Sequence, residues 1–351
     1  MMKKNSIYDQ LPPVLLAWYD VHKRDLPWRE NRDPYRIWVS EIMLQQTRVE
    51  AVKGYFTAFI KQFPTVQSLA EADDDLLHKL WEGLGYYSRV RNLKKAAISI
   101  MHDYNGVFPS QYTEVLSLPG IGPYTAGAIC SIAYDQPTPA IDGNVLRVIA
   151  RLTNDDTPID DPKMKQKINE ALEAVYPDRA GDFTQALMEL GATLCGPNGK
   201  PACELCPCRE FCLGYSRGRA DQLPVKKPKK ARRVEEKTVL ILSCNGRYAL
   251  KRRPGKGLLA SMWQFPELPT KLRAEQVLDK MEEMGVLPSN ITMQLERKHV
   301  FTHVEWDMSG VYLEVATESD RFSWFTPEEI SRDVALPTAY RLFWDEVFRG
   351  E

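Results

Sequence analysis

Leu118-Pro-Gly-Ile-Gly-Pro-Tyr-Thr-Ala-Gly-Ala-Ile129 is the stretch that decides the fold of the first half of the chain. Gly120 and Gly122 permit a tight turn with positive φ, and Pro123 suits the first turn of a following helix. We therefore expect two helices that meet at a glycine turn. The backbone N–H groups and the dipole at the start of the second helix can bind a phosphate there. An ordinary helix–helix corner fits the same residues.

Ala140-Ile-Asp-Gly-Asn-Val145 follows this hairpin and places Asp142 just before an apolar-periodic run. Asp is a favoured N-cap residue, so a helix is expected to begin here. The dipole of that helix also helps to hold the carboxylate ionised at neutral pH. Asp142 is therefore a candidate for capping and for catalysis, and the two roles do not exclude each other.

A second carboxylate, Glu41, lies in Ile37-Trp-Val-Ser-Glu-Ile-Met-Leu44, where six of eight residues are apolar. Helical spacing puts Ile37, Trp38 and Leu44 on the face of Glu41. Burial of a carboxyl group raises its pKa, and charged residues are seldom fully buried without a partner. Glu41 is thus either a costly structural residue or one kept for its chemistry. One protonatable and one ionised carboxylate form the pattern of a general acid beside an anionic stabiliser.

The composition is that of a soluble globular protein of two domains, with 351 residues, 44% of them hydrophobic and 26% charged. The net charge of −1 shows no global basic bias, which argues weakly against DNA binding and leaves it to local patches. The apolar run near the N-terminus is too short and too interrupted for a secretory or membrane segment. We expect a cytoplasmic, monomeric protein without a membrane association.

The apolar spacing is helical from residue 8 to about 190, so the first half is predicted to be nearly all α. After Glu236 the period changes, and we expect strands at 239–242, 248–250 and 310–315 with a helix around 275–284. The predicted fold class is therefore a multidomain α+β protein. Its expected parts are a helical domain over 1–220, a linker over 221–235 and an α+β domain over 236–351.

The linker contains Lys226-Lys-Pro-Lys-Lys-Ala-Arg-Arg233, with six basic residues in eight. This segment can lie along a DNA backbone, act as a nuclear localisation signal or remain a solvated tether.

Four cysteines form a compact set with the spacing C-x7-C-x2-C-x5-C, namely Cys195, Cys203, Cys206 and Cys212. Such crowding fits a metal site in a reducing compartment better than a disulfide framework. Four thiolates can hold zinc or an iron–sulfur cluster, and the spacing does not choose between them.

Together these motifs resemble those of the helix-hairpin-helix DNA glycosylases, and most closely of the adenine DNA glycosylases of the MutY type. The resemblance spans nearly the whole chain. It is carried by Trp28-Arg29, Glu41-Ile-Met-Leu-Gln-Gln-Thr-Arg48, Gly83-Leu-Gly-Tyr-Tyr87, the hairpin, Ala140-Ile-Asp-Gly-Asn144, Glu189-Leu-Gly-Ala192 and the four cysteines. It implies removal of adenine opposite 8-oxoguanine or guanine in double-stranded DNA, without strand cleavage.

The resemblance also implies roles for single residues. Glu41 would protonate the extruded adenine at N7, and Asp142 would stabilise or capture the sugar cation, as expected for N-glycosidic cleavage through an oxocarbenium-like state. Residues implied to assist or bind are Tyr124 and Asn144 at the sugar and Asp142; Trp28, Arg29 and Glu189 in the adenine pocket; Gln46, Thr47, Leu84 and Tyr86 at the opposing base; and Gly120 and Gly122 at the DNA backbone. Local packing is the alternative for Trp28, and a core aromatic at a helix end for the Gly83–Tyr87 loop.

The resemblance assigns a [4Fe–4S] cluster to Cys195, Cys203, Cys206 and Cys212. The chain departs from the usual C-x6-C opening by one residue and adds Cys208, which we interpret as a bystander.

The second half resembles the Nudix-like domain attached to adenine glycosylases. A catalytic Nudix box aligned on Glu282-Glu283 requires Gly, Glu and Arg where this chain has Gln264, Thr270 and Leu278. The metal-binding set is broken, so we expect a binding domain. In Phe301-Thr-His-Val-Glu-Trp306, Thr302 and His303 would read the base opposite adenine, and a β-turn that satisfies only its own backbone is the alternative.

Other enzyme classes also fit parts of the chain. An endonuclease-III-type glycosylase/lyase needs a lysine amine where the hairpin has Tyr124. A thymine-mismatch glycosylase would lack the added C-terminal domain. A Nudix pyrophosphatase is disfavoured by the broken box, and a relic that only binds lesions is disfavoured by the Glu41/Asp142 pair.

Overall fold

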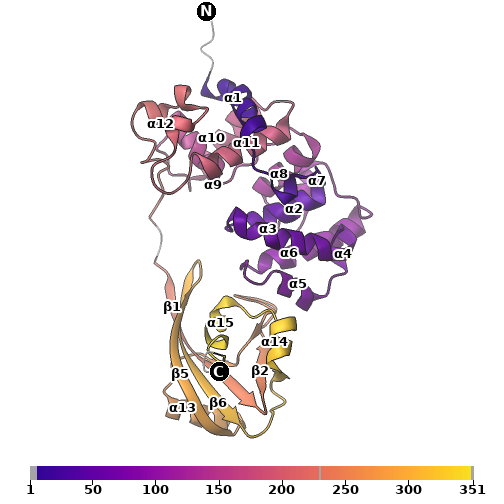
Figure 1. Cartoon of the computed structure of the whole chain (residues 1–351), viewed down its shortest axis with the longest axis vertical. Helices are drawn as coiled ribbons and strands as arrows, with labels where there is room; N and C mark the ends of the chain where they lie inside the picture. Colours follow the sequence, from indigo (N-terminus) through magenta and orange to yellow (C-terminus); the bar gives the residue numbers. More distant parts are fainter. Residues whose placement is uncertain (1–5, 229–230, 349–351) are drawn as a thin grey trace, which may run out of the picture. The chain divides into compact units, whose positions relative to one another are not determined.

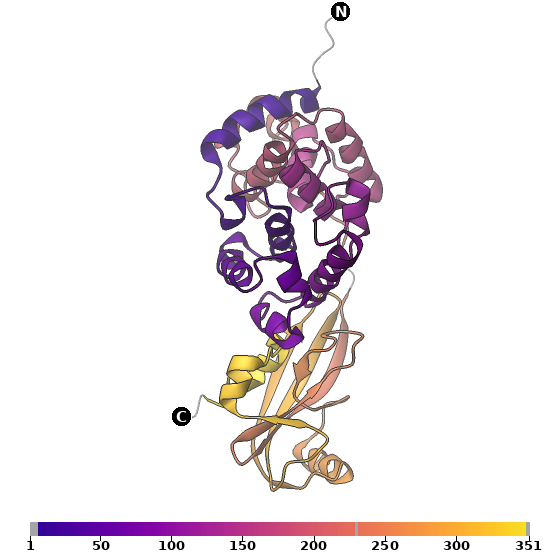
Figure 2. The ribbon, with the colours of Figure 1, turned by 90° about the vertical axis from the view of Figure 1, so that its right-hand side faces the viewer.

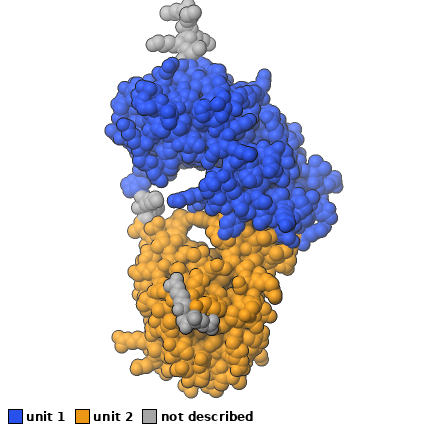
Figure 3. All heavy atoms as spheres, viewed as in Figure 1, with its two compact units in different colours: residues 1–71, 92–228 blue, residues 72–91, 229–351 orange. Residues whose placement is uncertain are grey.

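The computed structural model describes residues 6–228 and 231–348, and Figures 1 and 2 show its ribbon from two directions. The chain divides into two compact units, coloured in Figure 3. Unit 1 contains residues 1–71 and 92–228, and unit 2 contains residues 72–91 and 229–351. The expected helical domain over 1–220 thus differs from unit 1 in one respect. Residues 72–91 belong to the same unit as the C-terminal part.

Unit 1 is helical, as the apolar spacing predicts. Its helices are α1 (Ile7–His22), η1 (Pro27–Arg29), α2 (Pro34–Leu44), α3 (Val49–Gln62), α4 (Val66–Ala70), most of α6 (Ser88–Asp103), α7 (Tyr112–Ser117), α8 (Pro123–Tyr134), α9 (Gly143–Thr153), α10 (Pro162–Glu173), α11 (Ala180–Thr193), η2 (Cys203–Leu205), η3 (Arg209–Phe211) and α12 (Leu213–Ser216).

The core of unit 1 joins helices that are far apart in the sequence. Leu11 and Leu15 of α1 share a buried cluster with Val145 and Ile149 of α9 and with Leu187 of α11. Figure 2 shows α1, in indigo, running across later helices of unit 1. This packing fixes α9 and α11, which carry Asp142 at the N-cap and Glu189.

The predicted hairpin consists of α7 and α8. Gly120 has φ +79°, and a Cβ at this position would lie 2.5 Å from Cβ of Asn92, so only glycine fits. Gly122 differs from the prediction, because its φ of −102° is ordinary extended backbone at the N-cap of α8. Pro123 occupies the first turn of α8, as predicted.

Unit 2 has one mixed sheet with the strand order β3-β2-β1-β6-β5. Its elements are α5 (Asp74–Leu80), β1 (Arg233–Cys244), β2 (Arg247–Arg252), β3 (Trp263–Gln264), β4 (Glu267–Leu268), α13 (Ala274–Glu283), β5 (Pro288–Val300), β6 (Val304–Val315), β7 (Ser323–Phe325), α14 (Pro327–Asp333) and α15 (Thr338–Trp344). Strands β1 and β6 are parallel, and β5 pairs with β6 antiparallel. The three predicted strands and the predicted helix are all present.

Both faces of this sheet are covered, as the alternation along β1 shows. Val239 and Ile241 share a buried cluster with residues of α14 and α15. Leu240 and Leu242 belong to a second cluster, which contains residues of α13. Figure 1 shows α13 apart from α14 and α15 around the strands. Because both faces are buried, β1 is a continuous apolar run in its middle, which the sequence shows at 239–242.

The predicted linker is shorter in the structure than in the sequence analysis. β1 already begins at Arg233. The backbone carbonyl groups of Leu223 and Val225 accept hydrogen bonds from Arg151 and from the Ile159 N–H, so both belong to unit 1. Lys229 and Lys230 of the basic segment lie outside the described residues. Within the described part of the chain, the helices are all too short or too polar to span a bilayer.

Candidate active site

Unit 1 contains a cavity of about 160 Å³ that brings together both carboxylates singled out in the sequence. Its walls come from α2, η1, α8, the N-terminus of α9, and α11. The lining residues include Trp28, Arg29, Glu41, Thr47, Tyr124, Asp142, Asn144 and Glu189, together with Arg24, which the sequence analysis did not select. The catalytic and adenine-pocket candidates therefore share one site.

Glu41 is 5% exposed in α2, and the hydroxyl of Tyr124 donates a hydrogen bond to its Oε2 at 2.5 Å. The pKa of Glu41 is raised to about 7, chiefly by burial and also by the charge of Asp142, against the lowering effect of the Tyr124 hydrogen bond and of Arg29. The raised pKa agrees with the sequence prediction. At neutral pH a large fraction of Glu41 carries a proton that it can donate.

Asp142 is the N-cap of α9, and its Oδ1 accepts a hydrogen bond from the Val145 N–H at 2.8 Å. Its Oδ2 accepts from the Asn144 side chain at 2.6 Å. Burial nevertheless raises the pKa of Asp142 above its ordinary value, since it outweighs these hydrogen bonds and the nearby Arg147. The dipole of α9, from which the sequence predicts an ionised carboxylate, acts in the opposite direction. The two hydrogen bonds fix the carboxylate in place.

Glu189 lies on α11 and is 1% exposed. Arg24 binds it at 2.5 and 3.1 Å, and Arg29 donates to its Oε2 at 2.8 Å. Burial by itself would raise the pKa of Glu189, but the two arginines lower it below the usual value. Glu189 is thus a fixed acceptor in the cavity wall. Trp28 is buried beside it, with its ring edge-to-face on Phe56 at 5.6 Å.

Arg147 is a second residue that the sequence analysis did not select. Its guanidinium group donates to Asn144 Oδ1 at 2.8 Å and to the carbonyl groups of Gly191 and Cys195 at 2.7 and 2.8 Å. Gly191 must be glycine here, because a Cβ would lie 2.7 Å from Cβ of Asn144. A charged residue inside the apolar run of α9 is the same signal that identified Glu41 in α2.

The residues expected at the opposing base are distributed over both units. Gln46 is exposed and has φ +58°, and Thr47 follows it at the rim of the cavity in unit 1. In unit 2, Tyr86 is 47% exposed, whereas Leu84 is only 6% exposed. Leu84 therefore differs from the prediction: it is packed, and Tyr86 alone of this pair is presented to solvent.

The buried Arg89 side chain holds the Gly83–Tyr87 loop through hydrogen bonds to its backbone. The guanidinium group donates to the carbonyl groups of Leu84 at 2.8 Å and Gly85 at 3.1 Å. It also lies over the rings of Trp81 and Tyr86, with centroids at 5.3 and 5.7 Å. Burial lowers the pKa of Arg89 to about 10, which leaves it charged at neutral pH. These contacts of Arg89 stabilise the conformation of the loop.

Thr302 and His303 form the exposed turn between β5 and β6. The turn closes through the Phe301 N–H, which donates to the Val304 carbonyl group at 2.8 Å. The Thr302 hydroxyl is hydrogen-bonded to the Tyr86 hydroxyl at 2.7 Å. Both hydroxyls belong to unit 2, so this unit presents Tyr86 and the turn as neighbours.

Cys195, Cys203, Cys206 and Cys212 line one small cavity between α9, α11 and the following loops. Cys208 is fully buried but is not on the wall of this cavity, and it forms a hydrogen bond with Cys206. An Arg151 N–H points at Cys195 Sγ at 3.2 Å, as suits a thiolate ligand. Among the described residues, no three His, Cys, Asp or Glu side chains converge closely enough to hold a single metal ion. Four thiols around one cavity are donors that suit a metal cluster.

The three broken positions of the Nudix box lie in different surroundings in unit 2. Gln264 is buried and accepts hydrogen bonds from Arg253 and Tyr340. The Thr270 carbonyl group accepts from Thr238, and Leu278 is exposed on α13. None of these three side chains is a carboxylate or guanidinium group, which agrees with a binding domain.

Two family models match the chain, one before and one after the basic segment. Residues 39–174 match the family described as HhH-GPD superfamily base excision DNA repair protein, and residues 238–346 match the NUDIX domain family. The adenine DNA glycosylase of Homo sapiens is 34% identical, and the alignment covers 96% of this chain and 73% of the human protein. The adenine DNA glycosylase of Buchnera aphidicola subsp. Acyrthosiphon pisum is 33% identical over 90% of this chain and 89% of its own length.

Among solved structures, a thermostable thymine-DNA glycosylase is similar, with a TM-score of 0.53 and 28% identity. The similarity covers 58% of this chain and 94% of that protein. The two adenine glycosylases thus match nearly the whole chain, whereas this thymine glycosylase matches little more than half of it.

Proposed function

The chain belongs to the adenine DNA glycosylases of the helix-hairpin-helix base excision repair superfamily, and on that premise we propose that it excises adenine opposite 8-oxoguanine or guanine in duplex DNA. The observation that carries the proposal is the Tyr124–Glu41 hydrogen bond beside Asp142 in one cavity. In this cavity, which an extruded nucleotide would enter, Glu41 is the protonatable acid and Asp142 is the fixed carboxylate.

In this mechanism Glu41 donates its proton to the adenine base, so that the electron pair of the N-glycosidic bond leaves with a neutral base. Asp142 stabilises the positive charge that develops on the sugar, and water completes an abasic site. Tyr124 and Asn144 hold the two carboxyl groups in position. Trp28, Arg29 and Glu189 form the wall against which the base would bind. Gly120 and Gly122 would bring the backbone of the hairpin to a DNA phosphate.

The proposal includes hydrolysis without strand cleavage. A glycosylase/lyase needs an amine that forms a Schiff base with the sugar. The described residues that line the cavity include no lysine, and Tyr124 stands where that enzyme class carries one.

Single-turnover assays on three duplexes test this proposal, with A opposite 8-oxoguanine, A opposite G, and T opposite G. We expect excision from the first two, and strand breaks only after alkali treatment. Excision of T with none of A, or an abundant covalent adduct after borohydride reduction, would contradict the proposal.

We propose that the Phe301–His303 turn recognises the partner base, which is the base opposite adenine. 8-Oxoguanine differs from guanine at O8 and at the N7 hydrogen, and a hydroxyl with an imidazole can contact these groups for roughly 1–3 kcal/mol per good contact. Thr302 and His303 are exposed and available for this. We expect Thr302→Ala with His303→Ala to reduce the preference for 8-oxoguanine over guanine roughly tenfold or more, with the rate on A opposite G little changed. An unchanged ratio of single-turnover rates would assign the reading to Gln46, Thr47 and Tyr86.

We assign the four cysteines to a [4Fe–4S] cluster, which would link the 195–212 segment to α9 and α11 as a structural element. Their shared cavity and the Arg151 contact to Cys195 support this assignment. About four irons per chain with visible absorbance supports it, and one zinc per chain without colour overturns it.

A further inference from the structure

We propose that Glu82 is a positioning residue that anchors the Gly83–Tyr87 loop on the C-terminal part of unit 2. Through this anchor, Tyr86 and the Phe301–His303 turn act as one reading element. The inference rests on the proposed function, because it assumes that Tyr86 works at the base opposite adenine.

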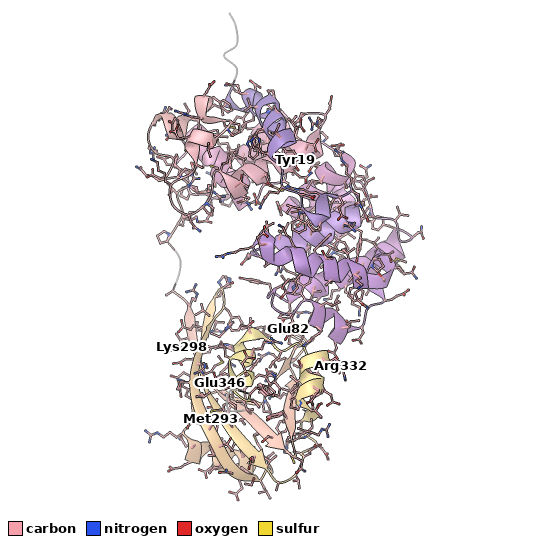
Figure 4. The ribbon with its side chains drawn as sticks, in the orientation of Figure 1. Tyr19, Glu82, Met293, Lys298, Arg332 and Glu346 are labelled. Atoms are coloured by element: carbon pink, nitrogen blue, oxygen red, sulfur yellow. The ribbon has the colours of Figure 1, made fainter. Side chains whose placement is uncertain are left out.

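Glu82 connects the start of the loop to the segment that leads into α15. Its Oε1 accepts hydrogen bonds from the Leu336 N–H at 3.1 Å and from Arg341 Nε at 2.9 Å. Its Oε2 lies 2.9 Å from Lys79 Nζ, and its side chain is 13% exposed. Both carboxylate oxygens are therefore used within unit 2. Figure 4 labels Glu82 at this position.

The preceding helix is attached to the same part of the unit. Lys79 donates to the Val334 carbonyl group at 3.0 Å, so it connects α14 with Glu82. Asp75 of α5 forms an ion pair with Arg252 of β2. The chain thus enters the loop from a helix that is held at both of its ends.

Three residues of the loop have a left-handed backbone conformation. Gly83, Gly85 and Tyr86 all have positive φ, of 95°, 69° and 46°. A non-glycine residue such as Tyr86 adopts this conformation only where its surroundings hold it there. The Tyr86–Thr302 bond holds the tip, and Arg91 donates to the Ala260 carbonyl group at 2.9 Å on the far side. Of these anchors, Glu82 is the one that accepts three hydrogen bonds or ion pairs from separate residues.

Substitution of Glu82 should therefore affect the recognition of the partner base and spare the chemical step. Loss of Glu82 leaves the buried Leu336 N–H without its acceptor and frees Arg341, so the start of the loop is held less firmly. The remaining contacts, the Tyr86–Thr302 bond among them, then have to hold the position of Tyr86 by themselves. The chemistry in unit 1 keeps all its residues, so the preference for the partner base falls more than the rate on the poorer substrate.

Glu346 offers a matched control, because it is also a mostly buried carboxylate in unit 2 that binds one arginine. It pairs with Arg297 at 2.8 Å, and its side chain is 15% exposed. Figure 4 labels it together with Glu82. Glu82→Ala, Glu82→Gln and Glu346→Ala in the full-length protein are the variants to compare.

Two measurements are made on each variant: amide hydrogen exchange of peptides covering 83–88 and Leu336, and single-turnover rates on A opposite 8-oxoguanine and A opposite G. We expect Glu82→Ala to accelerate exchange in both peptides at least tenfold and to reduce the rate ratio at least fivefold. Glu82→Gln should lie between wild type and Glu82→Ala, because its amide oxygen still accepts from Leu336 and Arg341. Glu346→Ala should change neither quantity.

The proposed anchoring role of Glu82 would be overturned by unchanged amide hydrogen exchange in Glu82→Ala. Equal changes in exchange in Glu346→Ala would overturn it as well. Accelerated exchange with an unchanged rate ratio would overturn the reading role. If the wild type excised no adenine from either duplex, the proposed function would fail, while the exchange data would still decide whether Glu82 anchors the loop. Should Glu82→Ala fail to fold, Glu82→Gln against Glu346→Gln gives the same comparison.

Discussion

Glu41→Gln is expected to lower adenine excision by at least roughly a thousandfold while the protein still binds duplexes with A opposite 8-oxoguanine, since general acid catalysis contributes about 10²–10⁴-fold. Gln keeps the shape and can still accept the Tyr124 hydrogen bond, but it has no proton to give. Burial disfavours the carboxylate form of Glu41, so the substitution should not reduce the melting temperature.

The pH dependence of the wild type checks the same group. Because Glu41 must be protonated to act and its pKa is about 7, the single-turnover rate should fall roughly tenfold per pH unit at alkaline pH. The burial that raises this pKa above 4.5 also costs stability once pH rises through the unfolded value, and the cost reaches roughly 3 kcal/mol above pH 7. Glu41→Gln should therefore remove the fall in rate above pH 7 and the fall in stability between about pH 4.5 and pH 7.

The matched control is Glu50→Gln on the exposed surface of α3, where the carboxylate pairs only with Lys53 in the described contacts. It should leave rate, affinity and melting temperature unchanged. Residual activity of Glu41→Gln within about tenfold of wild type, at most about 1.4 kcal/mol of barrier, would place the acid elsewhere.

Asp142→Asn is the second variant with a large expected effect, a loss of roughly a hundredfold to a thousandfold in the single-turnover rate, as for other electrostatic contacts to a transition state. Asn is as good an N-cap as Asp, so α9 keeps its first turn and the melting temperature should change little. What disappears is the negative charge beside the developing sugar cation.

Asp161→Asn is the control for this variant, because Asp161 caps α10 through the Lys163 N–H at 3.0 Å. Equal losses in both variants would mean that the effect arises from helix capping. A rate within tenfold of wild type for Asp142→Asn would mean that the carboxylate charge is not needed.

Local signals in the sequence predicted the parts of the site that depend on neighbours in the chain. Asp142 was predicted as an N-cap from the apolar run that follows it, and Pro123 as the first turn of α8. Glu41 was selected because a carboxyl group in an apolar helix has few structural reasons to be there. The assignment of these residues to roles came from the resemblance to a family, which local patterns alone do not supply.

Other features depend on partners that are distant in the sequence, and these were missed. Arg24 is bound to Glu189, so it has no local signature. Arg147 is a charged residue inside an apolar helix, but its partner, the Gly191 carbonyl group, is distant in the sequence. The burial of Leu84 was not predicted for the same reason. Gly122 was assigned a positive φ from its residue type, whereas the turn needs one only at Gly120.

Unit 2 is discontinuous in the chain, and this has a consequence for the order in which the protein is made. The 72–91 segment leaves the ribosome before residues 92–228 and before Thr302, Leu336 and Arg341, which hold it in the finished protein. At about 5–20 residues per second, the delay is on the order of ten seconds to a minute. During that interval the nascent chain can already contain both carboxylates of the cavity. Its reading loop, however, acquires its anchors only when synthesis has passed Arg341.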